Sequence, residues 1–160
     1  ADAELARASA ADGTGRSFVL GDDSDFLLFR GCRSIQISRI KVEDGVAEAP
    51  VWTRARLAEL CGLSEAQLVE WAMLLGNDYT SHIPTKSYSG LEGLDSASRR
   101  DPEEALEWVM AQPDNFLLAS QHPDASRALA FSRALYDLGA LGEFARDRPL
   151  QDVFQGEEKE

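Results

Sequence analysis

The chain has 160 residues, of which 44% are hydrophobic and 28% charged, and this is enough for one globular domain with its own core. The net charge is -12, and the two cysteines Cys32 and Cys61 stand far apart, which argues against an extended basic surface for nucleic acid, a disulfide scaffold and a cysteine-rich zinc site. No apolar run approaches the roughly 20 residues that cross a bilayer and no charged-then-apolar leader opens the chain, so we expect neither a membrane-spanning helix nor a secretion signal.

The first part of the chain predicts a helix, a short buried strand and a hairpin. Residues 1–11 are rich in Ala, Leu and Glu and are followed by Gly13, and because this helical pattern is already present at the first residue, we expect a piece of a longer protein. Residues 17–20 form an apolar run of strand length, closed by an acidic turn. Alternation over residues 35–42 predicts another strand, and the turn at 43–45 predicts a hairpin whose second strand extends the sheet.

The rest of the chain is mainly helical in its pattern. Ser64 and Gln67 form a capping box in front of the most strongly patterned helix, which Gly76 ends. Residues 78–100 lack a sustained period and predict a long loop or a degenerate small motif. Three further helices, each with a capping residue or proline at its start or a glycine at its end, are expected over residues 53–61, 101–110 and 124–138.

Acidic residues stand where three of these elements begin or end. Asp23 and Asp25 follow the strand at 17–20, where ligands collect at the carboxyl edge of an α/β sheet. Asp78 follows the C-terminus of a helix, whose dipole disfavours an unpaired carboxylate, so that a bound cation would relieve the repulsion. Asp2 provides a third direction of approach. Carboxylates from separated elements suit Mg²⁺, although turn capping and solvated charge explain the same residues without a metal.

Other polar residues near these acids have less specific signals. Asp22 lies inside the acidic turn and is either a hydrogen-bonding neighbour of the metal ligands or a solvated turn residue. His82 lies close to Asp78, but a loop histidine is more often simply exposed, so we place it outside the site. The best basic candidates for contact with a phosphate backbone are Lys86, Arg99 and Arg100.

Three sequence motifs follow one another within residues 1–83: ADAELA at the start, VLGDDSDFLLF at 19–29 and LLGNDY at 74–79. They resemble, in the same order, the acidic helix, the strand with its Asp-x-Asp-x-Leu turn and the Leu-Leu-Gly-x-Asp-Tyr motif of the flap endonuclease/XPG superfamily. The forms Asp-Ser-Asp-Phe and Gly-Asn-Asp-Tyr are most similar to the Asteroid-type branch of that superfamily.

The resemblance implies an α/β fold, as a PIN-like/XPG nuclease domain fragment with a mainly helical C-terminal part. Residues 1–83 would be the C-terminal portion of the nuclease domain, residues 84–154 a loop plus a helical extension, and residues 155–160 a disordered acidic tail. The motifs carry the family's metal ligands onto Asp2, Asp23, Asp25 and Asp78, with Mg²⁺ or Mn²⁺ as the cofactor.

The resemblance also implies a function for the parent protein. We expect a divalent-metal-dependent, structure-specific DNA endonuclease, present here as a partial chain, whose partner is branched or single-stranded DNA and whose location is intracellular and nuclear. A noncatalytic XPG-like scaffold that binds RNA or protein partners is the main alternative. A PIN-type ribonuclease is a third possibility, which a comparison of a DNA flap with single-stranded RNA as substrates would separate.

Overall fold

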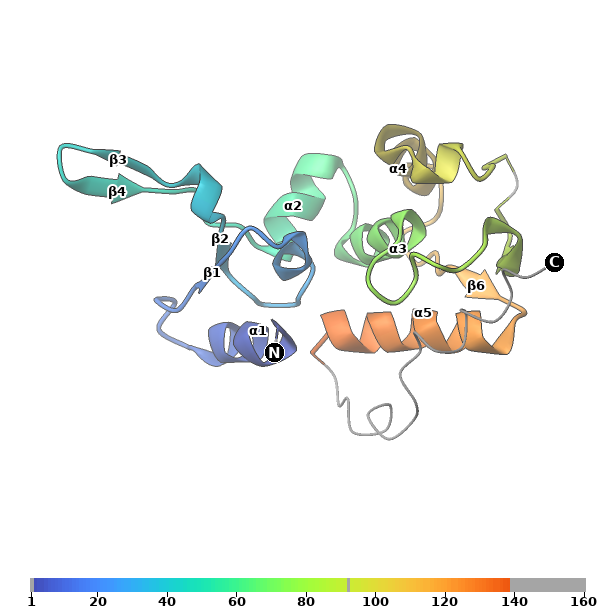
Figure 1. Cartoon of the computed structure of the whole chain (residues 1–160), viewed down its shortest axis with the longest axis horizontal. Coiled ribbons are helices and arrows are strands. Elements are labelled where there is room, and N and C mark those ends of the chain that lie inside the picture. The colour runs from blue at the N-terminus through green and yellow to red at the C-terminus, as the bar shows by residue number, and fades with distance from the viewer. Residues whose placement is uncertain (1, 92, 139–160) are drawn as a thin grey trace.

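The computed structural model describes residues 2–91 and 93–138 and shows a mixed α/β arrangement (Figure 1). Within these ranges the chain forms five α-helices, short 3-10 helices and three separate two-stranded sheets. No helix there is long and apolar enough to span a bilayer. The predictions for residues 139–154 and for the tail at 155–160 lie outside the described residues.

The N-terminal part is built on a parallel strand pair. Helix α1 (Asp2–Ala11) forms as predicted, and β1 (Val19–Leu20) pairs with β2 (Ser34–Ile35) in parallel. The expected buried strand is only half buried, since Val19 is 7% exposed and Leu20 61%. The acidic turn leads into a 3-10 helix, η1 (Ser24–Leu27), which buries Phe26 in the core.

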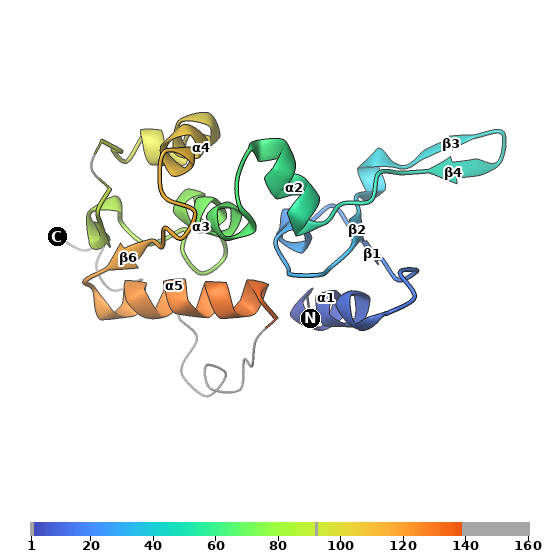
Figure 2. The same ribbon diagram turned by 180° about the vertical axis from the view of Figure 1, so that it is seen from behind.

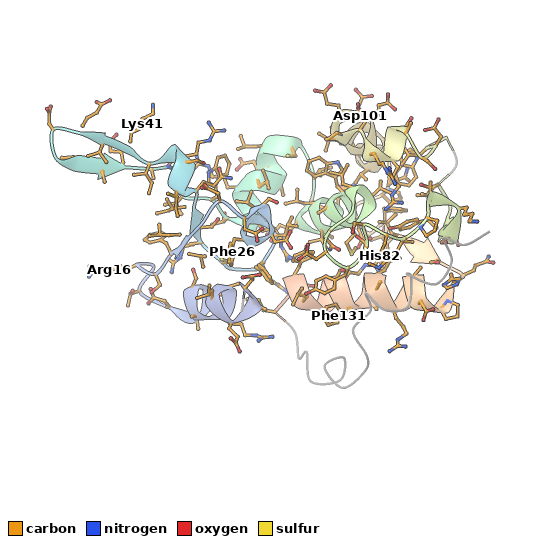
Figure 3. The ribbon with its side chains drawn as sticks, in the orientation of Figure 1. Arg16, Phe26, Lys41, His82, Asp101 and Phe131 are labelled. Atoms are coloured by element: carbon orange, nitrogen blue, oxygen red, sulfur yellow. The ribbon has the colours of Figure 1, made fainter. Side chains whose placement is uncertain are left out.

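The hairpin is confirmed, and the second strand, expected to run through Val51 and Trp52, meets the sheet only at an isolated bridge between Trp52 and Ser34 of β2. Strands β3 (Lys41–Glu43) and β4 (Val46–Glu48) pair only with each other within the described residues, and residues 37–39, expected in a strand, form a 3-10 helix, η2 (Ile37–Arg39). Asp44 and Gly45 both have positive φ, 50° and 76°, as a two-residue type I′ turn requires. The hairpin projects from the body and carries Lys41 away from the other elements (Figures 1 and 3).

The next two helices begin and end where their local signals predict. Helix α2 (Arg54–Cys61) is capped by Thr53, whose side chain accepts a hydrogen bond from the Arg56 N–H, and it ends at Gly62 in the left-handed conformation. Helix α3 (Glu65–Leu75) has the full capping box of Ser64 and Gln67. These helices follow from side-chain to backbone hydrogen bonds that the sequence itself specifies.

Helix α3 is the centre of the core. It packs against α2, α4 (Pro102–Met110) and α5 (Pro123–Tyr136), and Figure 1 shows it between α4 and α5. The large, fully buried side chains come from several of these elements and include Phe29, Leu68, Met73, Leu74, Val109, Leu129 and Tyr136. The predicted C-terminal extension, as far as residue 138, therefore shares one core with the predicted nuclease portion.

Residues 78–91 and 93–100 fold onto this core through Ile83, Tyr88 and Leu94, with short regular elements between the turns. They contain two 3-10 helices, η3 (Thr85–Ser87) and η4 (Ser98–Arg100), and a short strand, β5 (Tyr88–Ser89), that pairs with β6 (Ala119–Ser120). Arg99 is 3% exposed, and its guanidinium donates to the carbonyl oxygens of Leu74 at 2.6 Å and Ile83 at 2.7 Å. The expectation that Arg99 reaches a phosphate backbone is therefore wrong, because its donors hold this segment against α3.

Candidate metal centre

A polar pocket lies between the acidic turn and the loop that follows α3. Its volume is about 290 Å³, and its walls are Asp23, Ser24, Asp25, Gly76, Asn77, Asp78 and Ser81. The structure thus brings together three of the four acidic residues singled out in the sequence. Asp2 does not line this pocket, but it lies close enough for its charge to act on Asp25. In Figures 1 and 2 the C-terminal end of α5 points toward α1, the helix that begins at Asp2.

The acids of the turn divide into a structural group and a pocket group. Asp22 turns to η2, where its Oδ1 accepts hydrogen bonds from the Ser38 N–H at 3.0 Å and the Ser38 hydroxyl at 2.8 Å. These bonds hold the pKa of Asp22 below its ordinary value. Asp23 belongs to both groups. It lines the pocket, and its Oδ1 accepts the Asp25 N–H at 2.9 Å and so caps η1. Asp22 is therefore occupied by Ser38 outside the pocket, and capping accounts for one oxygen of Asp23.

Gly76 allows the second wall of the pocket to form. It has φ +106°, a conformation that residues with a side chain rarely adopt. A Cβ at this position would lie 2.8 Å from the Cα of Ser81, on the opposite side of the loop. The chain therefore folds back tightly after α3, and Asp78 is left exposed at the pocket.

Asn77 and Tyr136 join the two walls. The Asn77 Oδ1 accepts the backbone N–H groups of Tyr79 and Thr80, both at 2.9 Å, so the side chain fixes the turn that carries Asp78. The Asn77 amide donates to the Tyr136 hydroxyl at 3.1 Å, and this hydroxyl lies close enough to Asp25 to lower the pKa of that carboxyl. Asn77 lies inside the LLGNDY motif, so its place near the acidic residues could have been predicted from the sequence. No local sequence pattern indicates that Tyr136 lies beside them.

The pocket concentrates negative charge. Burial raises the pKa of Asp25, and repulsion from Asp23, Asp78 and Asp2 raises it further, partly offset by the hydrogen bond to Tyr136. Burial and three of the same carboxylates also raise the pKa of Tyr79. Among the described residues, no Lys or Arg forms an ion pair with Asp23, Asp25 or Asp78. The repulsion is therefore not compensated by that part of the protein.

The pocket fits a hard cation in its chemistry, though not as a preformed cage. Over residues 2–91 and 93–138, no group of three or more His, Cys, Asp or Glu side chains is already arranged to hold a metal ion. Mg²⁺ takes oxygen ligands, retains several waters and needs only one or two carboxylates in sites of this kind. Asp23, Asp25 and Asp78 offer such oxygens around an open, polar space. His82 is half-buried and does not line the pocket.

Comparison with known proteins does not assign the chain to a family. No family model matches it, and neither a curated protein nor a solved structure is significantly similar to it. The likeness to the flap endonuclease/XPG superfamily therefore depends on the motifs within residues 1–83 alone.

Proposed function

We propose that the carboxylate pocket binds Mg²⁺ or Mn²⁺ and that the chain is part of a structure-specific DNA endonuclease with a PIN-like fold of the XPG type. The observation that carries this proposal is the meeting of Asp23 and Asp25 with Asp78 around one polar pocket, although the two motifs lie far apart in the sequence. When bound, the cation would activate a water for attack on a phosphodiester and stabilise the leaving oxygen.

The electrostatics of the pocket support the proposal. Asp25 is partly buried beside other carboxylates, which is unfavourable in the absence of a cation. Such an arrangement is maintained at the expense of stability and is common at functional sites. The chain's charge of -12 would repel a phosphate backbone, so a bound cation is also what would let DNA approach.

The residues have separate roles in this proposal. Asp25 and Asp78 line the pocket, one from each wall, and act as ligands. Asp23 serves with one oxygen as the cap of η1 and contributes its remaining acceptor capacity to the cation. Asp2 acts through its charge at the edge of the site and, once a cation is present, as a ligand from α1.

A noncatalytic scaffold for RNA or protein partners is the second candidate. It is favoured by the hydrogen bonds that occupy Asp22 and Asp23 in capping roles and by the burial of Arg99. On this alternative the pocket is a polar hollow between two turns, and substitutions in it alter stability without altering any metal affinity.

A Mn²⁺ titration followed by electron paramagnetic resonance of the free ion separates these two candidates. The protein should bind Mn²⁺, and Asp25→Asn and Asp78→Asn should each weaken binding by at least about tenfold, since each removes a charged ligand. Asp22→Asn is the matched control, because this carboxylate lies in the same turn but is bonded to Ser38. If the unsubstituted protein binds no more Mn²⁺ than Asp25→Asn, the metal site is refuted and the scaffold is favoured.

The substrate class is tested next, with a DNA flap and a single-stranded RNA of equal length. On the proposed function the flap is cut in Mg²⁺ by the full-length protein, and cutting is lost in Asp25→Asn. Preferential cutting of the RNA would instead support a PIN-type ribonuclease.

A further inference from the structure

The C-terminal turn of α5 contacts both walls of the carboxylate pocket. Tyr136 is fully buried, its hydroxyl accepts the Asn77 amide of one wall at 3.1 Å, and it lies close enough to Asp25 of the other wall to lower the pKa of that carboxyl. The Tyr136 carbonyl also accepts the Arg30 N–H at 2.7 Å, which fixes the segment that follows the acidic turn. Ser132, one turn earlier on α5, receives a second hydrogen bond from the Asn77 amide at 3.3 Å.

The same end of α5 is held in place by charged contacts outside the pocket. Asp137 pairs with the buried Arg54 at 2.9 Å, and the Arg54 guanidinium also donates to the Leu28 carbonyl in the segment after the acidic turn. Arg133 forms a two-pronged pair with Glu70 of α3, at 2.6 and 2.7 Å, and Glu70 is 1% exposed. None of these four charged residues lines the carboxylate pocket. These pairs fix α5 against α3, which precedes the Asp78 wall, and against the segment after the acidic turn, which carries Asp25.

We infer that Tyr136 is a positioning residue of the carboxylate pocket, and that the docking of the α5 C-terminal turn thereby controls the cation affinity of Asp25 and Asp78. The inference rests on the proposed cation site and adds a regulatory element to it. The two walls are separate turns, one after β1 and one after α3. A cation ligated from both walls needs them at a fixed separation. Tyr136 contacts both sides, because its hydroxyl accepts the Asn77 amide of one wall and its carbonyl accepts the Arg30 N–H just after the other, with Asp25 close to the hydroxyl.

Thermodynamic linkage makes this coupling reciprocal. If a docked α5 raises the cation affinity, a bound cation must stabilise the docked α5 by the same free energy. Loosening the α5 turn should then lower the cation affinity of the pocket, and binding of a cation should make the α5 turn more stable. A purely structural tyrosine would lower the stability of the fold without producing this reciprocal effect.

The first experiment compares Mn²⁺ affinity in two tyrosine variants. Tyr136→Phe should weaken Mn²⁺ binding about tenfold, which corresponds to the loss of one hydrogen bond of roughly 1.4 kcal/mol. Tyr88→Phe is the matched control, since Tyr88 is also buried and its hydroxyl bonds to Arg99, away from the pocket. It should leave Mn²⁺ affinity unchanged. Circular dichroism melts check that both variants are folded.

A second variant keeps the inference testable if Tyr136→Phe fails to fold. Ser132→Ala removes one oxygen and one of the two α5 partners of Asn77, and should weaken Mn²⁺ binding by a smaller factor, about threefold. In parallel, Mn²⁺ should slow amide hydrogen exchange in the α5 turn at 132–137 in the unsubstituted protein and should leave it unchanged in Asp25→Asn.

The outcomes separate the inference from the proposed function. If the unsubstituted protein binds Mn²⁺ and both the Tyr136 and Ser132 variants bind it equally well, the positioning role is overturned and the metal site stands. If the unsubstituted protein binds no Mn²⁺, the metal site itself is refuted, and the control of its affinity by α5 is refuted with it. Weaker binding in Tyr136→Phe, intact binding in Tyr88→Phe and slower exchange in the α5 turn together support the inference.

Discussion

Gly76→Ala is the substitution that most directly tests the tight loop behind Asp78. An alanine would have to adopt φ +106°, which costs about 1–3 kcal/mol for a residue with a side chain. Its Cβ would also lie 2.8 Å from the Cα of Ser81, so the backbone must shift by several tenths of an ångström to restore an ordinary contact. We expect the two effects together to lower the free energy of unfolding by about 3–4 kcal/mol.

Gly90→Ala is the matched control for this experiment. Gly90 also has a positive φ, +78°, but a Cβ there would meet no atom within 4 Å. Its cost should be about 1 kcal/mol, from the backbone conformation alone. Urea denaturation of the two variants and the unsubstituted protein gives the comparison. A Gly76→Ala variant no less stable than Gly90→Ala would contradict the close approach to Ser81, and with it the described shape of the pocket wall.

Three other substitutions test the charges of the fold. Glu70→Gln should lower the free energy of unfolding by about 3 kcal/mol, because it removes the buried carboxylate that pairs with Arg133. Glu107→Gln, at an exposed position, should change it by less than about 0.5 kcal/mol. Equal losses for the two variants in urea denaturation would contradict a stabilising Glu70–Arg133 ion pair. Arg99→Lys should cost about 2 kcal/mol, since an ammonium cannot reproduce the planar fork of hydrogen bonds, and Arg100→Lys, at an exposed position, should be neutral in the same assay. Asp25→Asn should raise the thermal midpoint of unfolding in EDTA at pH 7. The pKa of Asp25 is higher in the folded than in the unfolded protein, so the ionised carboxylate destabilises the native state at neutral pH. This destabilisation disappears as the pH falls through the raised pKa toward about 4, the pKa of an unfolded aspartate. An Asp25→Asn variant with the same gain at pH 4 and pH 7 would show that the effect is not electrostatic.

The helices were predictable because their signals are local. The hydroxyls of Thr53 and Ser64 and the carboxylate of Asp101 each accept backbone N–H groups within the next three residues, so the sequence itself contains the bonds that start α2, α3 and α4. The turn of the hairpin was equally local, since Asp44 and Gly45 are among the residues that tolerate positive φ.

The errors in the fold have non-local causes. Residues 35–42 alternate like a strand, but η2 interrupts them because the backbone is drawn to the Asp22 carboxylate through Ser38. Arginine is a residue type usually found at the surface. The burial of Arg99 becomes favourable only because its guanidinium donates to the carbonyl groups of Leu74 and Ile83, which the fold brings near. Neither contact can be read from neighbouring residues.

The candidate site shows the same division. Asp23, Asp25 and Asp78 were found because acids follow a strand and a helix, and the structure places them around one pocket. Tyr136 was missed, since its role depends on how α5 packs and not on any local pattern. The type and spacing of residues can therefore mark proposed ligands, whereas a proposed positioning residue such as Tyr136 is marked only by its contacts.

The position of Tyr136 also changes how the predicted division of the chain should be understood. Residues 84–154 were expected to be an extension to a nuclease portion ending at residue 83, yet the Tyr136 hydroxyl, near the end of the described residues, is bonded to Asn77 of one wall and lies close to Asp25 of the other. On the proposed function, a protein cut between α4 and α5 would keep every carboxylate ligand and still lose cation affinity, because Asn77 would lose its bond to Tyr136 and Asp25 its neighbouring hydroxyl. On the proposed function, cation binding would therefore need the whole segment from α1 to α5, and not only the part that carries the motifs.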